Sequence, residues 1–274
     1  MKRKLIQLSP STAVVSLPSQ WVKRNRLRKG IELDVEENEN RIIISTQAKK
    51  SERETSIDVS KLSGKLMWLT IDAAYTAGYD RITIMTKDQE QTAYMTKVVR
   101  YFPGFIIEEE RKRSVVLRDM AEQGMELDKI LSRVFNLNIG LLEDAVEAAK
   151  AGDWETLKSI KRRDYTINSY IALCLRHINK FGYSPFSRTG SMHSYIRTLE
   201  TLSDNLCELC ADIGRTHEGR KMIEQALTLY RLIPKLHFSF SQEQLLQFDT
   251  AREAAGKIGD MFSDVEEREL TLHA

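Results

Sequence analysis

Two pairs of oxygen-bearing side chains recur at a four-residue spacing in the C-terminal half of the chain. Glu200 and Asp204 form one pair, and Asp164 and Asn168 form the other. Side chains four residues apart share one face of a helix, so each pair presents its oxygens in one direction. If the two helices pack together, the four side chains form a site for a divalent metal or iron rather than for a thiol-bound ion. The alternative is two ordinary polar helix faces.

A second group of residues is cationic and lies at the N-terminus. The first 50 residues hold 11 Lys and Arg against five acidic residues (net +6), whereas the whole chain carries only +2. Clustered cations favour a polyanionic partner, and duplex DNA is bound through such phosphate contacts. The alternative is a solvated basic face. The candidate DNA-binding residues are Lys2, Arg3, Lys4, Lys23, Arg24, Arg26, Arg28 and Lys29.

The elements that would position these groups divide into three segments, predicted as residues 1–48, 54–120 and 125–270. The first segment is predicted as strands at 4–7 and 13–17, a helix at 20–25 and a hairpin over 32–45. So small a unit has too little core to stand alone, and an obligate homodimer that shares its hairpins would solve this.

The second segment alternates strand and helix patterns, which predicts a small α/β domain. Its first helix, over 62–76, is expected to place Leu66, Leu69 and Ala73 on its apolar side. From residue 125 onward the apolar residues recur at helical spacing, which predicts an all-α bundle. Gly152-Asp153 should end one helix and cap the next, which is expected to run from 154 towards 180. Further helices are predicted at 192–213, 217–232 and 242–266, so the predicted fold class is α+β and multidomain.

Several classes of protein are not favoured by the sequence. No apolar stretch approaches the length of a membrane span, so no membrane insertion is expected. The chain shows no P-loop, G-x-S-x-G or Rossmann glycine pattern, and we expect no enzyme. Three cysteines argue against a disulfide framework and favour a cytoplasmic location. Cys207 and Cys210 form a C-x2-C inside a predicted helix without a second such pair, and we expect them to be half-buried packing residues.

The N-terminal segment resembles the SpoVT/AbrB swapped-hairpin family. The matching features are the basic strand at Arg3-Lys4, the proline step Val15-Ser16-Leu17-Pro18, and the turn Lys29-Gly30. The resemblance implies a dimeric swapped-hairpin β-barrel that binds DNA. Ser9-Pro10 and Ile31 stand where relatives often have glycine and an acidic residue, so dimerisation without DNA binding stays open as an alternative.

The C-terminal segment resembles the archaeal-type PhoU proteins, which are helical bundles. One matching helix begins Arg163-Asp164, reaches Asn168 and continues to Asn179, and the next carries Leu199-Glu200-x-Leu202-x-Asp204. The resemblance implies iron, zinc or another metal ion held by Asp164, Glu200 and Asp204, with Asn168 at the position of a second acid. The segment around Gly78-Tyr79-Asp80 resembles the connecting domain of archaeal phosphate uptake regulators, which join these parts in this order.

Together the two resemblances imply a phosphate-responsive, dimeric transcriptional regulator that acts negatively on phosphate uptake or metabolism. DNA would bind the N-terminal module, and the bundle would sense a metal ion or a partner. The alternative is an adaptor that does not bind DNA and regulates a phosphate transporter ATPase or a sensor kinase by protein contact. A metalloenzyme is a third reading, but the Glu-x-x-His pairs typical of helical di-metal enzymes do not accompany Glu200.

Overall fold

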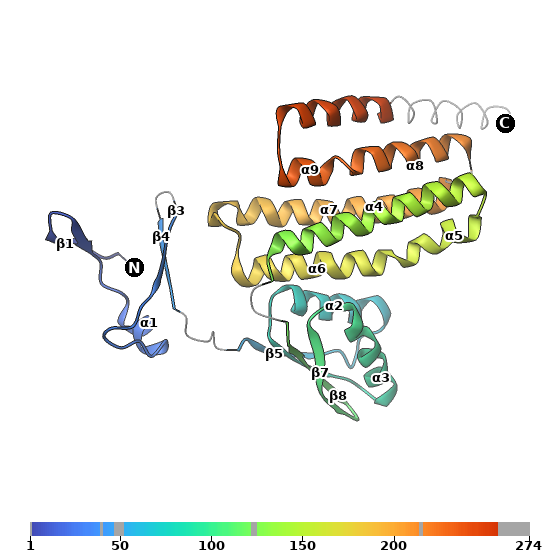
Figure 1. Ribbon diagram of the computed structural model, residues 1–274. Helices are drawn as coiled ribbons and strands as arrows, with labels where there is room; N and C mark the ends of the chain where they lie inside the picture. The colour runs from blue at the N-terminus through green and yellow to red at the C-terminus, as the bar shows by residue number, and fades with distance from the viewer. Residues whose placement is uncertain (1, 39–40, 47–51, 122–124, 214–215, 257–274) are drawn as a thin grey trace, which may run out of the picture. The chain divides into compact units, whose positions relative to one another are not determined.

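The computed structural model describes residues 2–38, 41–46, 52–121, 125–213 and 216–256. The chain forms two compact units, Met1–Ser51 and Glu52–Ala274. Both are drawn in Figure 1, the first in blue and the second from teal to red. The structure is mixed α+β, with small sheets followed by a helical C-terminal region.

The N-terminal unit contains two separate antiparallel hairpins joined by a short helix. Strands β1 (Ile6–Ser9) and β2 (Thr12–Val14) form the first hairpin, with Ile6 opposite Val14. Helix α1 (Ser19–Arg24) follows Pro18, and β3 (Asp34–Asn38) and β4 (Arg41–Ser45) form the second hairpin. The predicted order is confirmed, but the first two strands lie closer to the turn than predicted. The pairing register explains the shift, because β2 ends at the residue that faces the start of β1.

The N-terminal unit has no interior among its described side chains. None of them is buried, and apolar residues of both hairpins are largely exposed: Leu5 by 72%, Leu8 by 67%, Val35 by 64% and Ile42 by 68%. Val35 faces Ile44 across the hairpin and Ile42 faces Glu37, so Val35, Ile42 and Ile44 lie on one face. A two-stranded hairpin of this kind is marginally stable at best in water.

The second unit begins with a small α/β domain. Its strands are β5 (Glu54–Asp58), β6 (Arg81–Met85), β7 (Phe105–Arg111) and β8 (Ser114–Asp119), in the order β5-β6-β8-β7. Strands β5 and β6 are parallel, and the other pairings are antiparallel. Helix α2 (Gly64–Thr76) connects β5 to β6, and α3 (Gln89–Val98) with the short 3-10 helix η1 (Val99–Tyr101) connects β6 to β7.

The predicted apolar face of α2 is wrong. Leu66 and Leu69 are exposed, whereas Met67, Ile71, Ala74 and Tyr75 are buried. The helix carries two apolar stripes at helical spacing, and the one that includes the large Tyr75 ring faces inward. Its hydroxyl donates a hydrogen bond to the Pro103 carbonyl at 2.8 Å, which satisfies the polar end of a buried ring.

The helical region begins with α4 (Leu127–Ala151), which ends at Gly152 in the left-handed conformation with φ of 71°. The Asp153 side chain accepts a hydrogen bond from the Thr156 amide at 3.1 Å and caps α5 (Trp154–Ser159), as predicted. The single helix predicted from 154 towards 180 is instead interrupted. The 3-10 turn η2 (Ile160–Arg162) separates α5 from α6 (Asp164–Phe181), and the buried Ile160 anchors that turn.

The remaining helices complete the bundle drawn from green to red in Figure 1. A 3-10 turn η3 (Phe186–Arg188) leads into α7 (Thr189–Ile213), followed by α8 (His217–Tyr230), α9 (Ile233–Phe238) and a helical segment over 242–256. The predicted helix 242–266 lies beyond the described residues after 256. Helix α4 packs on α6 and α8, and α6 packs on α7. Among the described helices, none is long and apolar enough to cross a bilayer.

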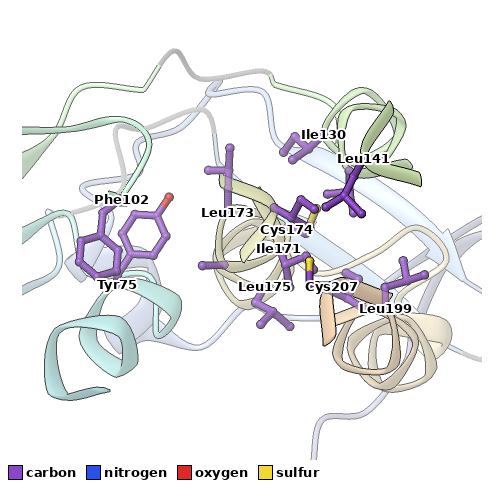
Figure 2. Packing of buried hydrophobic residues seen from close by; sticks show 14 of the residues in the cluster. Tyr75, Phe102, Ile130, Leu141, Ile171, Leu173, Cys174, Leu175, Leu199 and Cys207 are labelled. Atoms are coloured by element: carbon purple, nitrogen blue, oxygen red, sulfur yellow. The ribbon is translucent and has the colours of Figure 1, made fainter. Parts of the chain in front are cut away.

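The core runs without a break from the α/β domain into the bundle. Figure 2 shows Tyr75 and Phe102 of the α/β domain near the α6 side chains Ile171, Leu173 and Leu175. The α6 side chains in turn contact residues of α4 and α7. Helix α6 is therefore the element that the two parts of this unit share.

Polar contacts fix the α/β domain to α6. The buried Arg176 side chain donates to the carbonyls of Tyr75 and Tyr79 at 2.7 and 2.8 Å and to Asp119 at 2.5 Å. One turn later, Lys180 bonds Asp119 at 2.9 Å, and it bonds Asp80 at 2.5 Å. Arg176 thus adds a second donor to the Tyr75 carbonyl, which also accepts from the Gly78 amide at 3.0 Å, and supplies a donor to the Tyr79 carbonyl in the loop after α2.

Candidate functional site

Three of the four predicted site residues meet where α6 lies beside α7. The Asn168 side-chain amide donates to Asp164 Oδ2 at 2.9 Å and to Asp204 Oδ1 at 3.3 Å. Asn168 therefore links a carboxylate on its own helix to one on the neighbouring helix. The predicted convergence of the two four-residue pairs is confirmed for these side chains.

Glu200 lies one helical turn before Asp204 and has a different partner. Its Oε2 accepts a hydrogen bond from Arg197 Nη1 at 2.7 Å, a pair three residues apart on α7. Glu200 shares a pocket with Asp164 and Asn168, but it makes no hydrogen bond to either of these described residues. Its contribution to the site is its charge.

The carboxylates of the site outnumber the cations beside them, and the pKa of two of these carboxylates is raised. Burial, followed by a hydrogen bond to the Asp204 carboxyl and repulsion from Asp204 and Glu200, raises the pKa of Asp164 to about 7. Burial and repulsion from Glu200 also raise the pKa of Asp72, against the lowering effect of Arg197. Near neutral pH the Asp164 carboxyl thus retains a proton for part of the time, because burial and then the neighbouring carboxylates disfavour its ionised form.

The donor set fits a metal ion only in part. Across the described ranges, no three His, Cys, Asp or Glu side chains are arranged to hold one ion. Asn168 directs its NH2 group at the two carboxylates, and an NH2 group cannot ligate a cation. Rotation of the amide by half a turn would present Oδ1 instead, beside Asp164 and Asp204. The Oδ1 atoms of Asp164 and Asn168 are both buried without a hydrogen-bond partner.

These residues form part of a cleft between the α/β domain and the bundle, which we call the junction cleft. Its inner lobe, of about 140 Å³, is bordered by Trp68 and Asp72 of α2, Tyr101 of η1, and Asp164, Tyr165, Asn168, Arg197 and Glu200 of the bundle. Its outer lobe, of about 790 Å³, shares Trp68, Asp164, Tyr165 and Asn168 and adds Lys65, Tyr94, Lys161, Asp204 and Glu208.

Sequence reasoning missed the side of the junction cleft that α2 and η1 supply. Asp72 is a lone acid in a helix of a different predicted domain, and no spacing relates it to Glu200. The ring centroids of Trp68 and Tyr101 are 5.2 Å apart, and those of Tyr101 and Tyr165 are 5.6 Å apart. This row of rings joins α2 to α6 and could be found only from the tertiary structure.

The eight candidate DNA-binding residues all lie in the N-terminal unit and are exposed. Lys2, Arg3 and Lys4 precede β1, whereas Lys23 and Arg24 form the basic last turn of α1. Arg26, Arg28 and Lys29 follow in the loop to β3. No ion pair to a described residue occupies any of the eight, so their charges are available to an external anion.

The three cysteines are free and buried. Burial raises the pKa of Cys174, Cys207 and Cys210 to about 12. Figure 2 shows Cys174 and Cys207 among the apolar side chains of the core. Cys207 and Cys210 are packing residues as predicted, but they are fully buried rather than half-buried.

Comparison with known proteins adds no relative. No protein-family model matches the chain, and neither the curated proteins nor the solved structures contain a match.

Proposed function

We propose that the protein is a homodimeric, DNA-binding transcriptional regulator whose helical region senses a ligand at the junction cleft. The resemblances in the sequence favour a role for that regulation in phosphate uptake or metabolism. In this proposal the N-terminal unit dimerises as a swapped-hairpin barrel and contacts DNA. The connecting domain and the PhoU-like bundle hold the sensory site, where a metal ion or a partner would bind.

The observation that carries this proposal is that no described side chain of the N-terminal unit is buried. Exposing Leu5, Leu8, Val35 and Ile42 to water is unfavourable, by about 25 cal/mol for each Å² of apolar surface. A second copy of the same unit would cover these surfaces and supply the missing core. Dimerisation would also bring two sets of eight exposed cations together, and a dimeric protein that binds two DNA half-sites needs such a pair of basic surfaces.

Analytical ultracentrifugation over a range of protein concentrations tests the dimer. We expect the wild-type chain to sediment as a dimer, and Ile42→Glu to sediment as a monomer because a charge then lies on the proposed interface. Ile106→Glu is the matched control, since Ile106 is an exposed apolar strand residue of the other unit. A monomeric wild type, or a dimer that Ile42→Glu leaves intact, contradicts the proposal.

DNA binding is tested by titrating labelled genomic duplex fragments at about 50 and 200 mM salt, where phosphate contacts produce a steep fall in affinity. Replacing Arg3, Arg24 and Arg28 with alanine should weaken binding at both salt concentrations. The salt slope should fall by about 0.9 for each phosphate that the variant no longer neutralises. Arg252→Ala, in the helical segment 242–256, is the control and should bind as wild type. Absence of binding at the lower salt concentration refutes the DNA-binding part.

The adaptor remains the second candidate function, and one observation favours it. Phe238, Phe240, Leu245 and Leu246 are exposed where α9 leads into the segment 242–256. An apolar surface there suits a protein partner such as a phosphate transporter ATPase or a sensor kinase. Capture of a purified candidate partner that is abolished in Leu246→Glu but kept in Ile42→Glu supports this function. Equal capture by both variants argues against it.

A further inference from the structure

The junction cleft combines aromatic and acidic walls in a space too large for one bare ion. Its inner lobe of about 140 Å³ has room for several water molecules, each of which occupies about 30 Å³ in the liquid. The outer lobe extends the space past Asp204 and Glu208. A ligand that fills it must be an organic molecule, and its chemistry can be derived from the groups that border the cleft.

The inner lobe has an excess of negative charge. It is bordered by the carboxylates of Asp72, Asp164 and Glu200, and by one cation, Arg197, which bonds to Glu200 at 2.7 Å. Asp72 and Asp164 form no ion pair with any residue in the described ranges. The nearest lysines do not correct this, because Lys65 and Lys161 border the outer lobe only and Lys161 pairs with Asp212 at 3.6 Å.

The buried polar atoms that lack partners here are both acceptors. Neither Asp164 Oδ1 nor Asn168 Oδ1 accepts a hydrogen bond from a described residue, although buried acceptors in proteins are nearly always paired. A ligand that satisfies them must carry N–H or O–H donors. An ammonium group supplies three donors and the positive charge that the carboxylates need.

The aromatic rings of the cleft add a third constraint on the ligand, besides its positive charge and its hydrogen-bond donors. Trp68, Tyr101 and Tyr165 border the inner lobe, and the Tyr165 side chain is 54% exposed although it lies at a packed junction. Aromatic faces attract ammonium groups and pack against methylene chains. A metal ion makes no use of such a wall, whereas an alkylammonium ion uses both the rings and the carboxylates.

We propose that the junction cleft binds a linear aliphatic diamine or polyamine. One ammonium group lies in the inner lobe between Asp72, Asp164 and Glu200, and its methylene chain lies along Trp68 and Tyr165. The chain leads into the outer lobe, where Asp204 and Glu208 receive the second ammonium group. This inference rests on the proposed sensory role of the cleft, for which it names the ligand class, and it does not depend on DNA binding.

Isothermal titration calorimetry of the full-length protein without DNA tests the ligand class. Putrescine and spermidine should bind saturably at a constant ionic strength. n-Butylamine, which has one ammonium group like a lysine side chain, should bind about tenfold more weakly, because it cannot reach both lobes. Binding of Mn²⁺ or Mg²⁺ without saturable binding of either amine overturns the proposal, and so does butylamine binding equal to that of putrescine.

Asp72→Asn separates a binding role from a structural one. Asp72 has no hydrogen bond or ion pair through its side chain in the described structure, and its charge is repelled by Glu200. The variant should therefore raise the melting temperature of the free protein while weakening putrescine binding about tenfold. Lower stability, or unchanged putrescine affinity, contradicts the assignment.

Two further variants test the aromatic wall and the outer lobe of the junction cleft. Tyr165→Leu should weaken binding about fivefold because it removes a ring that makes a cation–π interaction, and Glu208→Gln should reduce the advantage of putrescine over butylamine. The matched controls are Phe240→Leu and Glu155→Gln, exposed residues outside the cleft that should bind as wild type. If the cleft variants bind as their controls do, the amine site lies elsewhere and the proposal fails. If the protein does not bind DNA, the proposed DNA-binding function of the N-terminal unit is wrong. The calorimetric test of amine binding does not depend on that outcome.

Discussion

Arg176 offers the sharpest test of how the α/β domain is attached to the bundle. The Arg176 side chain is only 3% exposed, and it donates three hydrogen bonds to Tyr75, Tyr79 and Asp119. The change Arg176→Met keeps most of the side-chain volume and removes every donor. It removes the donor to the part-buried Tyr79 carbonyl, one of two donors to the Tyr75 carbonyl, and one of the two cations that bond to Asp119.

The size of the effect follows from these changes. Breaking a buried ion pair from one side costs about 3–5 kcal/mol. The lower half of that range applies to Asp119, because Lys180 still bonds it at 2.9 Å. The Tyr79 carbonyl adds about 1 kcal/mol, and the Tyr75 carbonyl adds less because it keeps the Gly78 amide as a donor. The Tyr75 and Phe105 rings, both 4.9 Å from the guanidinium carbon, no longer have a cation beside them, and this adds somewhat less. Since these contributions overlap, we expect a decrease of about 4 kcal/mol in the free energy of unfolding.

Urea unfolding followed by tryptophan fluorescence measures this decrease, since Trp68 borders the junction. The control is Arg118→Met, which removes an exposed arginine paired with Glu108 and Glu52 on the sheet. Exposed pairs contribute at most about 1 kcal/mol, so the control should change little. An Arg176→Met variant within about 1 kcal/mol of wild type, at an unchanged denaturant slope, would refute the reasoning that this residue holds the two parts together.

Three more predictions concern the interior of the second unit. The pKa of Asp164 is raised from 3.8 to about 7 in the fold, so its protonation stabilises the protein fully below about pH 4 and this stabilisation disappears as the pH rises through 7. Asp164→Asn should therefore reduce the fall in melting temperature between about pH 5 and 8, and an unchanged fall contradicts that pKa. Asn168→Asp supplies the second acid that the PhoU resemblance implies for a metal site. It should lower the melting temperature at about pH 8 without metal and restore it with Mn²⁺, whereas a temperature that Mn²⁺ does not alter argues against any ion site there. The cysteines, with pKa values of about 12, should react with a thiol reagent only as the protein unfolds, and rapid reaction of the native protein would show that the interior opens.

The sequence predicted those parts of the structure that depend on local spacing. Gly152 and Asp153 ended one helix and capped the next as predicted, because left-handed glycine and N-cap aspartate act within a single turn. Asp164, Asn168 and Asp204 converged because each four-residue pair occupies one helix face and the apolar stripes of α6 and α7 pack together.

The features that sequence did not predict depend on contacts between distant segments. The inward face of α2 was misassigned because the helix has two apolar stripes, and only tertiary packing, in which Tyr75 lies against Phe102 and Phe105, decides between them. Asp72 and Tyr101 reach the cleft from a different domain. Two of the three partners of Arg176 are backbone carbonyl groups, which every residue has and no sequence pattern distinguishes, and the third, Asp119, lies 57 residues earlier in the chain.

Helix α6 carries Asp164 and Asn168 in its first turns and Arg176 and Lys180 in its last. Its 18 residues span about 27 Å at 1.5 Å for each residue. An α-helix resists compression along its axis, so a displacement of its first turn is transmitted to its last turn nearly undiminished. The sheet, fastened to those last turns through Asp80 and Asp119, must then follow. Helix α6 therefore couples the Asp164 and Asn168 end of the junction cleft mechanically to the sheet.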